Sequence, residues 1–126
     1  MNNPEHLEQV ALFQWASLND ERIPELKLMF HIPNGGHRHK AVAAKMKAEG
    51  VKAGVPDILL ACPRDGFHGL FIEMKAGKNR TTKSQNEWIQ RLLGVGYLAV
   101  VCYGFEEAKK EIMDYLDWKE VDLTNG

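Results

Sequence analysis

The stretch that decides the fold runs from Gly54 to Lys75 and reads GVPDILLACPRDGFHGLFIEMK. It holds an apolar run, Ile58–Cys62, and a second strand-like run, Leu70–Lys75, joined by a short connection with proline and glycine. Two strands this close in the chain pair as an antiparallel hairpin. The stretch therefore predicts a hairpin whose open end, away from the turn, lies at Asp57.

Charged side chains gather at that open end. If the turn centres near Gly66, the numbers of partner residues sum to about 132, so Asp57 lies beside Lys75. Glu73 comes two residues before Lys75, and side chains two apart on a strand share a face. Cross-strand neighbours lie about 5 Å apart. The pattern predicts that Asp57, Glu73 and Lys75 converge at the mouth of the hairpin.

These residue types suit one kind of chemistry. Two neighbouring carboxylates repel each other unless a cation lies between them. Oxygen ligands without paired His or Cys favour magnesium or manganese. A lysine beside them can orient or deprotonate a water, or stabilise negative charge on phosphate, as metal-assisted phosphodiester hydrolysis requires. A Glu-x-Lys tripeptide can also be an exposed ion pair, but the apolar residues that alternate with Glu73 and Lys75 favour an interior strand.

The rest of the chain alternates between helical and extended patterns. Helices are predicted over residues 4–18, 39–49, about 84–93 and 105–116, and strands over 26–32 and 97–103. Ser84 and Glu87 have the spacing of a capping box. The run 97–103 is almost entirely apolar, which predicts a strand buried on both faces. The order predicts an α/β fold with a mixed central β-sheet flanked by helices.

Composition sets wider bounds. The chain has 126 residues, 44% apolar and 26% charged, as expected for one soluble globular domain. Cys62 and Cys102 lie far apart in apolar runs, which is typical of reduced core thiols in a cytoplasmic protein. Neither a signal peptide nor an apolar run of about 20 residues is recognisable. The three tryptophans fit a core or an interface better than a platform for stacked bases.

The net charge of −1 conceals an uneven distribution. Between His37 and Lys83 there are ten Lys/Arg and four acids, whereas the rest of the chain has six Lys/Arg and thirteen acids. A basic centre with acidic flanks fits a surface that faces phosphates. It fits a plain solvated face as well.

At this point the motifs resemble a known family. Gly54-Val55-Pro56-Asp57 followed by Ile72-Glu73-Met74-Lys75 resembles the Pro-Asp…Glu-x-Lys motif of the PD-(D/E)XK nuclease superfamily. Within it, the opening helix with Glu8-Gln9 and the loop Pro33–Gly36 are similar to the virus-type replication-repair nuclease family, VRR-NUC, in its small stand-alone phage form. The resemblance spans roughly Glu5 to Tyr103. It implies a restriction-endonuclease-like αβββαβ core and a single nuclease domain over residues 1–126.

The resemblance also implies roles in the site. Asp57 and Glu73 would hold Mg²⁺ or Mn²⁺ together with the backbone carbonyl of Met74. Lys75 would act on the attacking water.

Three further polar residues would surround this centre. Glu8 would reach it from the first helix and hold a water or the metal, with Glu5 as the alternative. Gln85 would help to place Lys75 or a phosphate. Capping or solvation is the alternative role for Glu8 and Gln85.

Basic and polar residues near the motif are candidates for contacts with nucleic acid. The loop 34–40 would allow the backbone to approach phosphate closely, though it could equally be a solvated turn; two histidines at alternate positions are weak evidence for a metal site. The candidates are Asn34, His37, Arg38, His39, Lys40, Lys78, Arg80 and Lys83.

The expected function is that of a magnesium- or manganese-dependent DNA endonuclease in the cytoplasm of a bacterial or phage-infected cell. The resemblance implies a homodimer that acts on branched DNA, such as four-way junctions, in repair or replication. A non-catalytic DNA-binding or docking subunit and an RNA-processing nuclease are the alternatives.

Overall fold

A computed structural model describes residues 4–34 and 39–118 of the chain. Two of the predicted DNA-contacting residues, His37 and Arg38, lie outside the described residues. No helix in the described part is long and apolar enough to cross a membrane.

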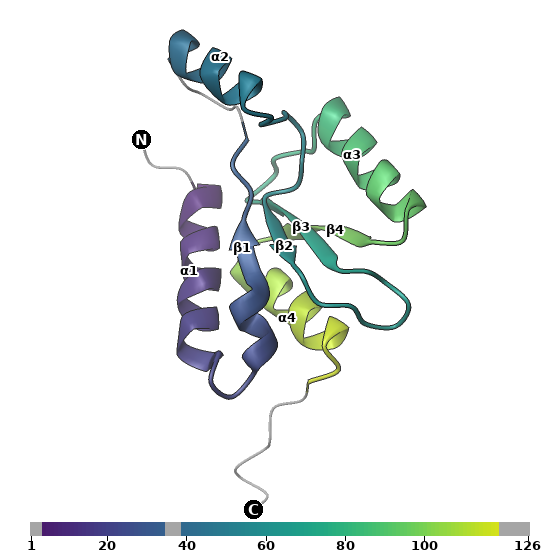
Figure 1. The fold of residues 1–126 in the computed structure, drawn as a ribbon. Helices are drawn as coiled ribbons and strands as arrows, with labels where there is room; N and C mark the ends of the chain where they lie inside the picture. Colours follow the sequence, from purple (N-terminus) through teal and green to yellow (C-terminus); the bar gives the residue numbers. More distant parts are fainter. Residues whose placement is uncertain (1–3, 35–38, 119–126) are drawn as a thin grey trace, which may run out of the picture.

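Helices and strands follow the predicted order, with one short helix added. The elements are α1 (Pro4–Asn19), the 3-10 helix η1 (Pro24–Leu28), β1 (Met29–His31), α2 (Lys40–Ala48), β2 (Ile58–Leu60), β3 (Leu70–Lys75), α3 (Lys83–Gly94), β4 (Leu98–Tyr103) and α4 (Phe105–Tyr115) (Figure 1). Without α2 and η1, and before the closing helix α4, this is the expected αβββαβ core. The predicted strand over 26–32 begins late because η1 takes its first residues after Pro24, which starts a helical turn.

The sheet has the strand order β1-β2-β3-β4. β1 pairs with β2 and β2 with β3 in antiparallel fashion, whereas β3 and β4 are parallel. The sheet is therefore mixed, as predicted, and the helix α3 forms the crossover between its parallel strands. β4 lies at an edge and is only partly buried, so the prediction of a strand buried on both faces was wrong for it. β3 occupies that interior position, with all six residues buried.

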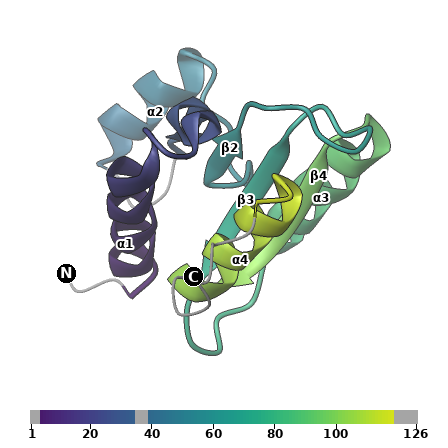
Figure 2. The same ribbon diagram turned by 90° about the horizontal axis from the view of Figure 1, so that it is seen from below.

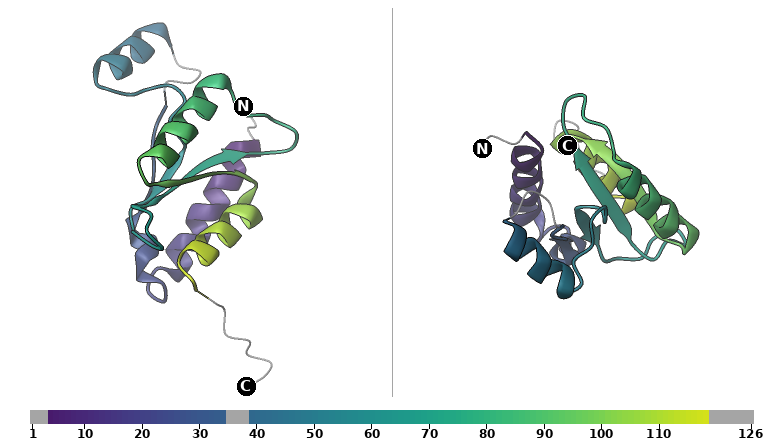
Figure 3. Two further views of the ribbon diagram at one scale, coloured as in Figure 1. Left: turned by 90° about the vertical axis from the view of Figure 1, so that its right-hand side faces the viewer. Right: turned by 90° about the horizontal axis from the view of Figure 1, so that it is seen from above.

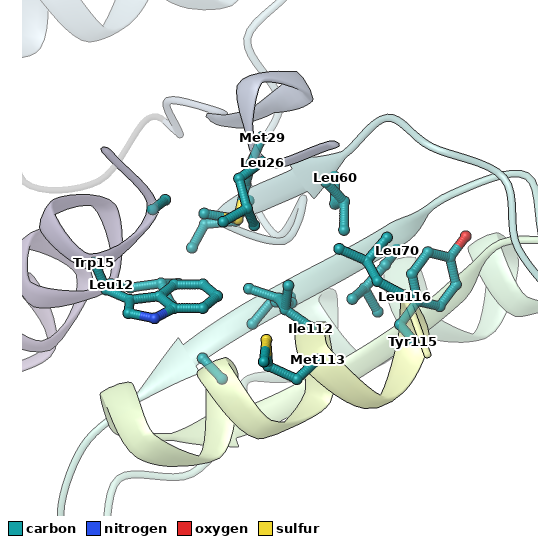
Figure 4. Packing of buried hydrophobic residues seen from close by; sticks show 14 of the residues in the cluster. Leu12, Trp15, Leu26, Met29, Leu60, Leu70, Ile112, Met113, Tyr115 and Leu116 are labelled. Atoms are coloured by element: carbon teal, nitrogen blue, oxygen red, sulfur yellow. The ribbon is translucent and has the colours of Figure 1, made fainter. Parts of the chain in front are cut away.

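Helices cover both faces of the sheet. Figure 3 shows α3 on one side of the strands and α1 and α4 on the other, and Figure 2 shows α4 lying across β3 and β4. The main core fills the space between α1, α4 and the sheet, where Leu12, Leu70 and Ile112 are fully buried (Figure 4). A smaller apolar cluster around Phe71 and Ile89 joins the other face to α3. Successive residues of β3 thus point to different apolar clusters, as the pleat of a strand requires.

The hairpin forms, but its register differs from the prediction. Ile58 pairs with Ile72, so the partner numbers of β2 and β3 sum to 130 and Asp57 falls opposite Glu73 rather than Lys75. The tip is a two-residue turn at Asp65 and Gly66, both with positive φ, and its register alone would give a sum of 131. The segment 61–63 therefore carries one more residue than its partner strand. A shift of two in the sum keeps every side chain on its predicted face.

Helix α2 is set apart from the body of the molecule (Figure 1). It contains no buried residue. Its chain leaves the sheet after β1 and returns before β2, so α2 is an excursion between two strands that pair with each other.

Candidate active site

A polar cavity of about 260 Å³ lies where α1 and α3 begin and β3 ends. Its lining combines residues from five parts of the chain, among them the segment just before β2. The lining residues are Glu5, His6, Gln9, His31, Asn34, Asp57, Glu73, Met74, Lys75 and Gln85.

Two carboxylates meet at the floor of this cavity. Asp57 Oδ2 accepts a hydrogen bond of 2.8 Å from the backbone N–H of Met74, which fixes the aspartate against β3. Glu73 is only 2% exposed, because β3 is the interior strand. Asp57, Glu73 and Lys75 all line this cavity, so the three side chains lie together as predicted.

The protonation of Glu73 reflects this crowding. Burial, followed by the charge of Asp57 and a hydrogen bond with its carboxyl group, raises the pKa of Glu73 to about 9, against an opposing effect of Lys75. When Glu73 is ionised, its Oε1 is buried without a hydrogen-bond partner among the described residues. A buried carboxylate oxygen without a donor is costly, so the pair needs either a shared proton or a cation.

The donor set fits a hard divalent cation. In the described part of the chain no three His, Cys, Asp or Glu side chains are grouped closely enough to hold a metal by themselves. Mg²⁺ commonly binds through one or two carboxylates and keeps several waters. Asp57 and Glu73 both line the cavity, and Glu73 Oε1 has no hydrogen-bond partner among the described residues, so the pair matches that requirement.

Lys75 lies between two acids. Its Nζ is 3.9 Å from Glu73 Oε2 and 3.8 Å from Glu5 Oε1, and the residue is 7% exposed. The contact with Glu5 crosses from β3 to the first turn of α1. The ammonium group is therefore held at the cavity from two sides.

Gln85 is held in place by the start of α3. Its Oε1 accepts from the backbone N–H of Thr82, and the Thr82 hydroxyl accepts from the N–H of Gln85. The remaining amide group, Nε2, is 3.3 Å from Glu73 Oε2 and donates to it. The capping box thus orients Gln85 toward Glu73. Its members are Thr82 and Gln85 rather than the predicted Ser84 and Glu87, since the helix begins at Lys83.

Gly54 shows why the motif before Asp57 begins with glycine. Its φ is +92°, and a Cβ there would come within 2.8 Å of the backbone carbon of Ser84. The segment that carries Asp57 is therefore in backbone contact with the helix that carries Gln85.

Glu8 does not line the cavity, and its predicted place in the site is corrected. Its Oε2 accepts a 2.7 Å hydrogen bond from the backbone N–H of Phe105, the first residue of α4. Gly104 precedes that helix and has no side chain to cap it. Glu5, the alternative one turn earlier on α1, is the acid that lines the cavity.

The sequence did not point to three other residues that line the cavity, His6, Gln9 and His31. His31 Nδ1 lies 2.9 Å from the backbone carbonyl of Asp57 and 3.1 Å from Gln9 Nε2. The signal available in the sequence was the position of His31 at the end of a short strand, two residues before Pro33. Asn34, which the sequence suggested as a contact to phosphate, lines the cavity.

The other described candidates for phosphate contact are at the surface. His39 caps the start of α2 by accepting from the N–H of Ala41 at 3.4 Å, and Lys40 is the first residue of that helix. Lys78 and Arg80 are exposed on the segment that joins β3 to α3, and Lys83 is exposed as the first residue of α3. None of these five residues lines the cavity.

A mixed sheet that sets Pro56-Asp57 beside Glu73-Met74-Lys75 has the arrangement of PD-(D/E)XK-type nucleases. The VRR-NUC domain model matches residues 3–106, and the chain belongs to this family. The family implies a nuclease of the PD-(D/E)XK type. A solved structure described as a VRR_NUC domain protein is similar with a TM-score of 0.77 and 31% sequence identity, over 97% of this chain and 95% of that one. No protein with a curated description matches.

Proposed function

We propose that this chain is a magnesium- or manganese-dependent DNA endonuclease and that the cavity around Glu73 is its active site. The observation that carries the proposal is the buried Glu73 carboxylate, which lies against Asp57 and has one oxygen without a hydrogen-bond partner in the part of the chain that the structure describes. A carboxylate pair of this kind is expensive in a merely structural role. Beside Lys75 and in a nuclease family, it fits phosphodiester hydrolysis.

Asp57, Glu73 and the backbone carbonyl of Met74 would hold the cation. When bound, it would polarise the phosphate and favour ionisation of a nearby water. Lys75 Nζ orients the attacking water or stabilises the negative charge that develops on the phosphate, and Glu5 and Glu73 hold the ammonium group in position. Gln85 keeps one oxygen of Glu73 in place by donating to it. Attack of water on phosphorus and departure of the 3′ oxygen would leave 5′-phosphate ends.

The proposal extends to the substrate and the assembly. We propose branched DNA, such as a four-way junction, as the substrate and a homodimer as the active form, because a domain this small covers little duplex by itself. Several apolar side chains are exposed on α1 and β1, which fits a contact with a second copy: Leu7, Val10, Leu18 and Phe30. We also propose one nuclease domain over residues 1–126, of the phage type and with a role in DNA repair or replication. A cytoplasmic location fits its two free buried cysteines.

Cleavage of end-labelled junction, flap and linear DNA, with magnesium, manganese or EDTA, tests the activity. We expect cleavage only with a divalent cation, and loss of it in Lys75→Ala. Failure of the wild type to cut any of the three, or full activity in Lys75→Ala, would refute the proposal. RNA of the same shape, run in parallel, tests the choice of DNA. Light scattering tests the homodimer.

Calorimetric titration with Mg²⁺ and Mn²⁺ separates an enzyme from a docking subunit with the same fold. We expect binding to the wild type that Asp57→Asn weakens strongly. A chain that binds neither ion would be a docking subunit.

A further inference from the structure

Helix α2 and the loop after it carry an excess of positive charge, and no acid in the described part of the chain pairs with their lysines. Residues 39–56 contain four lysines and one acid, Glu49. α2 buries no side chain, so packing does not explain why it protrudes.

Three of the lysines lie on one continuous surface. Lys40 and Lys47 are seven residues apart, which puts them on the same face of α2 about 10 Å apart along its axis. Lys47 and Lys52 line the same hollow, of about 580 Å³. We call Lys40, Lys47 and Lys52 the lysine ridge. Lys45 lies on the opposite side of the helix, about 160° away from Lys47.

The end of α2 fixes the ridge. The N–H of Gly50 donates to Lys47 O and the N–H of Val51 donates to Met46 O, both at 3.0 Å. With the positive φ of Gly50, this is the Schellman ending of a helix. The turn reverses the chain so that Lys52 returns beside Lys47.

The lysine ridge lies close to the cavity because short stretches of chain connect the two. The excursion that contains α2 leaves from Asn34 and returns at Asp57, and both residues line the cavity. Lys52 lies five positions before Asp57 in the chain, a span of no more than about 17 Å. Figure 1 shows α2 at the end of the molecule where α1 and α3 begin, which is the end that holds the cavity.

We propose that the lysine ridge binds the sugar-phosphate backbone of the same DNA whose scissile phosphate enters the cavity, within about one helical turn of the cut. This inference rests on the proposed function. The cavity itself is lined by three acids, Glu5, Asp57 and Glu73, against one lysine, Lys75, so it supplies little attraction for a polyanion until a cation is bound. The ridge supplies the attraction that the cavity lacks. It contributes affinity and salt dependence, while the chemical step depends on the cavity.

Fluorescence anisotropy of a labelled four-way junction and a labelled linear duplex, in EDTA so that nothing is cut, tests the ridge. The variant Lys47→Gln/Lys52→Gln is expected to weaken binding about tenfold at 100 mM salt and to reduce the slope of log K against log salt by about 2, since each lost phosphate contact removes about 0.9. Lys45→Gln, on the opposite face of the same helix, is the matched control and should stay within about twofold of the wild type. Melting curves verify that all three chains fold equally.

The outcomes separate this inference from the proposed activity. Unchanged affinity and salt slope in the double variant would overturn the ridge, and so would a loss of DNA affinity in Lys45→Gln equal to that in the double variant. A double variant that loses binding to anionic vesicles but keeps its binding to DNA would overturn it as well. In single-turnover cleavage at saturating DNA, the double variant should keep the wild-type rate, and a large loss of rate would place the ridge in the chemical step. A wild type that binds DNA through the ridge and never cuts it would refute the nuclease and leave the ridge standing.

Discussion

Two acids of this protein, Glu8 and Glu73, differ in whether their carboxylate oxygens find hydrogen-bond donors. Glu8 extends from α1 to the start of α4, where its carboxylate accepts the N–H of Phe105. Glu73 lies in the interior strand and keeps one buried oxygen without a donor among the described residues. A buried polar group is normally satisfied, so the satisfied acid indicates a structural part and the unsatisfied one a site for a ligand.

The same contrast applies to the regions around them. The junction of α1 and α4 is apolar and includes Leu12 and Ile112. At the carboxyl end of β3, in contrast, Asp57, Glu73 and Lys75 crowd together where hydrophobic packing would be more stable. Natural proteins accept local cost of this kind at functional sites.

The largest expected effect is on catalysis, and its absence would remove the difference proposed between Glu73 and Glu8. Glu73→Gln should lower the cleavage rate by about 10³-fold or more, because the cavity loses one of its two carboxylates at the reacting centre. Glu8→Gln should cut at close to the wild-type rate. Initial rates on one labelled junction measure both. A Glu73→Gln chain with more than a tenth of the wild-type rate would remove Glu73 from the site.

Backbone contact near the cavity gives the next effect. Gly54→Ala should destabilise the protein by about 2–3 kcal/mol, since the new Cβ meets the backbone of Ser84 in addition to the strain of a positive φ. Gly66→Ala is the matched control. It also has a positive φ, of +83°, but no atom within 4 Å of the added Cβ, so we expect a loss of about 1 kcal/mol. Urea unfolding measures both, and equal losses would show that the contact with α3 contributes nothing.

The raised pKa of Glu73 predicts how stability depends on pH. The pKa is about 9 in the folded chain against an ordinary value of 4.5, so between these two pH values the folded state keeps a proton that the unfolded state has released. Without a divalent cation, the contribution of Glu73 to stability is therefore greatest below about pH 4.5, falls through this window and levels off above about pH 9. At pH 8 in EDTA, Glu73→Gln should be more stable than the wild type by about 1–3 kcal/mol, with little difference at pH 4.

Thermal melts in EDTA and in magnesium measure this effect. Magnesium should raise the melting temperature of the wild type much more than that of Glu73→Gln. A wild type that is more stable than the variant at pH 8 in EDTA would contradict the account of the buried carboxylate.

The smallest effects come from the two acids one turn apart on α1. Glu8→Ala should cost about 1–2 kcal/mol of stability, as loss of a helix cap does, and leave the cleavage rate within about twofold. Glu5→Gln should do the reverse, with a rate about tenfold lower because Lys75 loses one of its two partners, and stability within about 0.5 kcal/mol. Urea unfolding and initial rates are measured on both variants. A Glu8→Ala chain that loses activity but not stability, together with a Glu5→Gln chain that loses stability but not activity, would contradict the roles assigned to these two acids.

The sequence by itself determined the fold class, the order of the elements and the set Asp57, Glu73 and Lys75. Alternation along a strand and the closeness of two strands in the chain are local properties, and they bring these residues to one end of a hairpin whatever surrounds it. That is also why an error of two residues in the register left their convergence unchanged.

Tertiary structure alone decided which neighbours complete the site. Glu5 and Glu8 have equivalent local signals, and only the packing of α1 against β3 and α4 gives one to Lys75 and the other to Phe105. The edge position of β4 likewise depends on how the strands assemble, because an apolar run looks the same at an edge and in the interior. Local chemistry can be read along the chain, whereas the partner of a side chain depends on contacts between segments far apart in sequence.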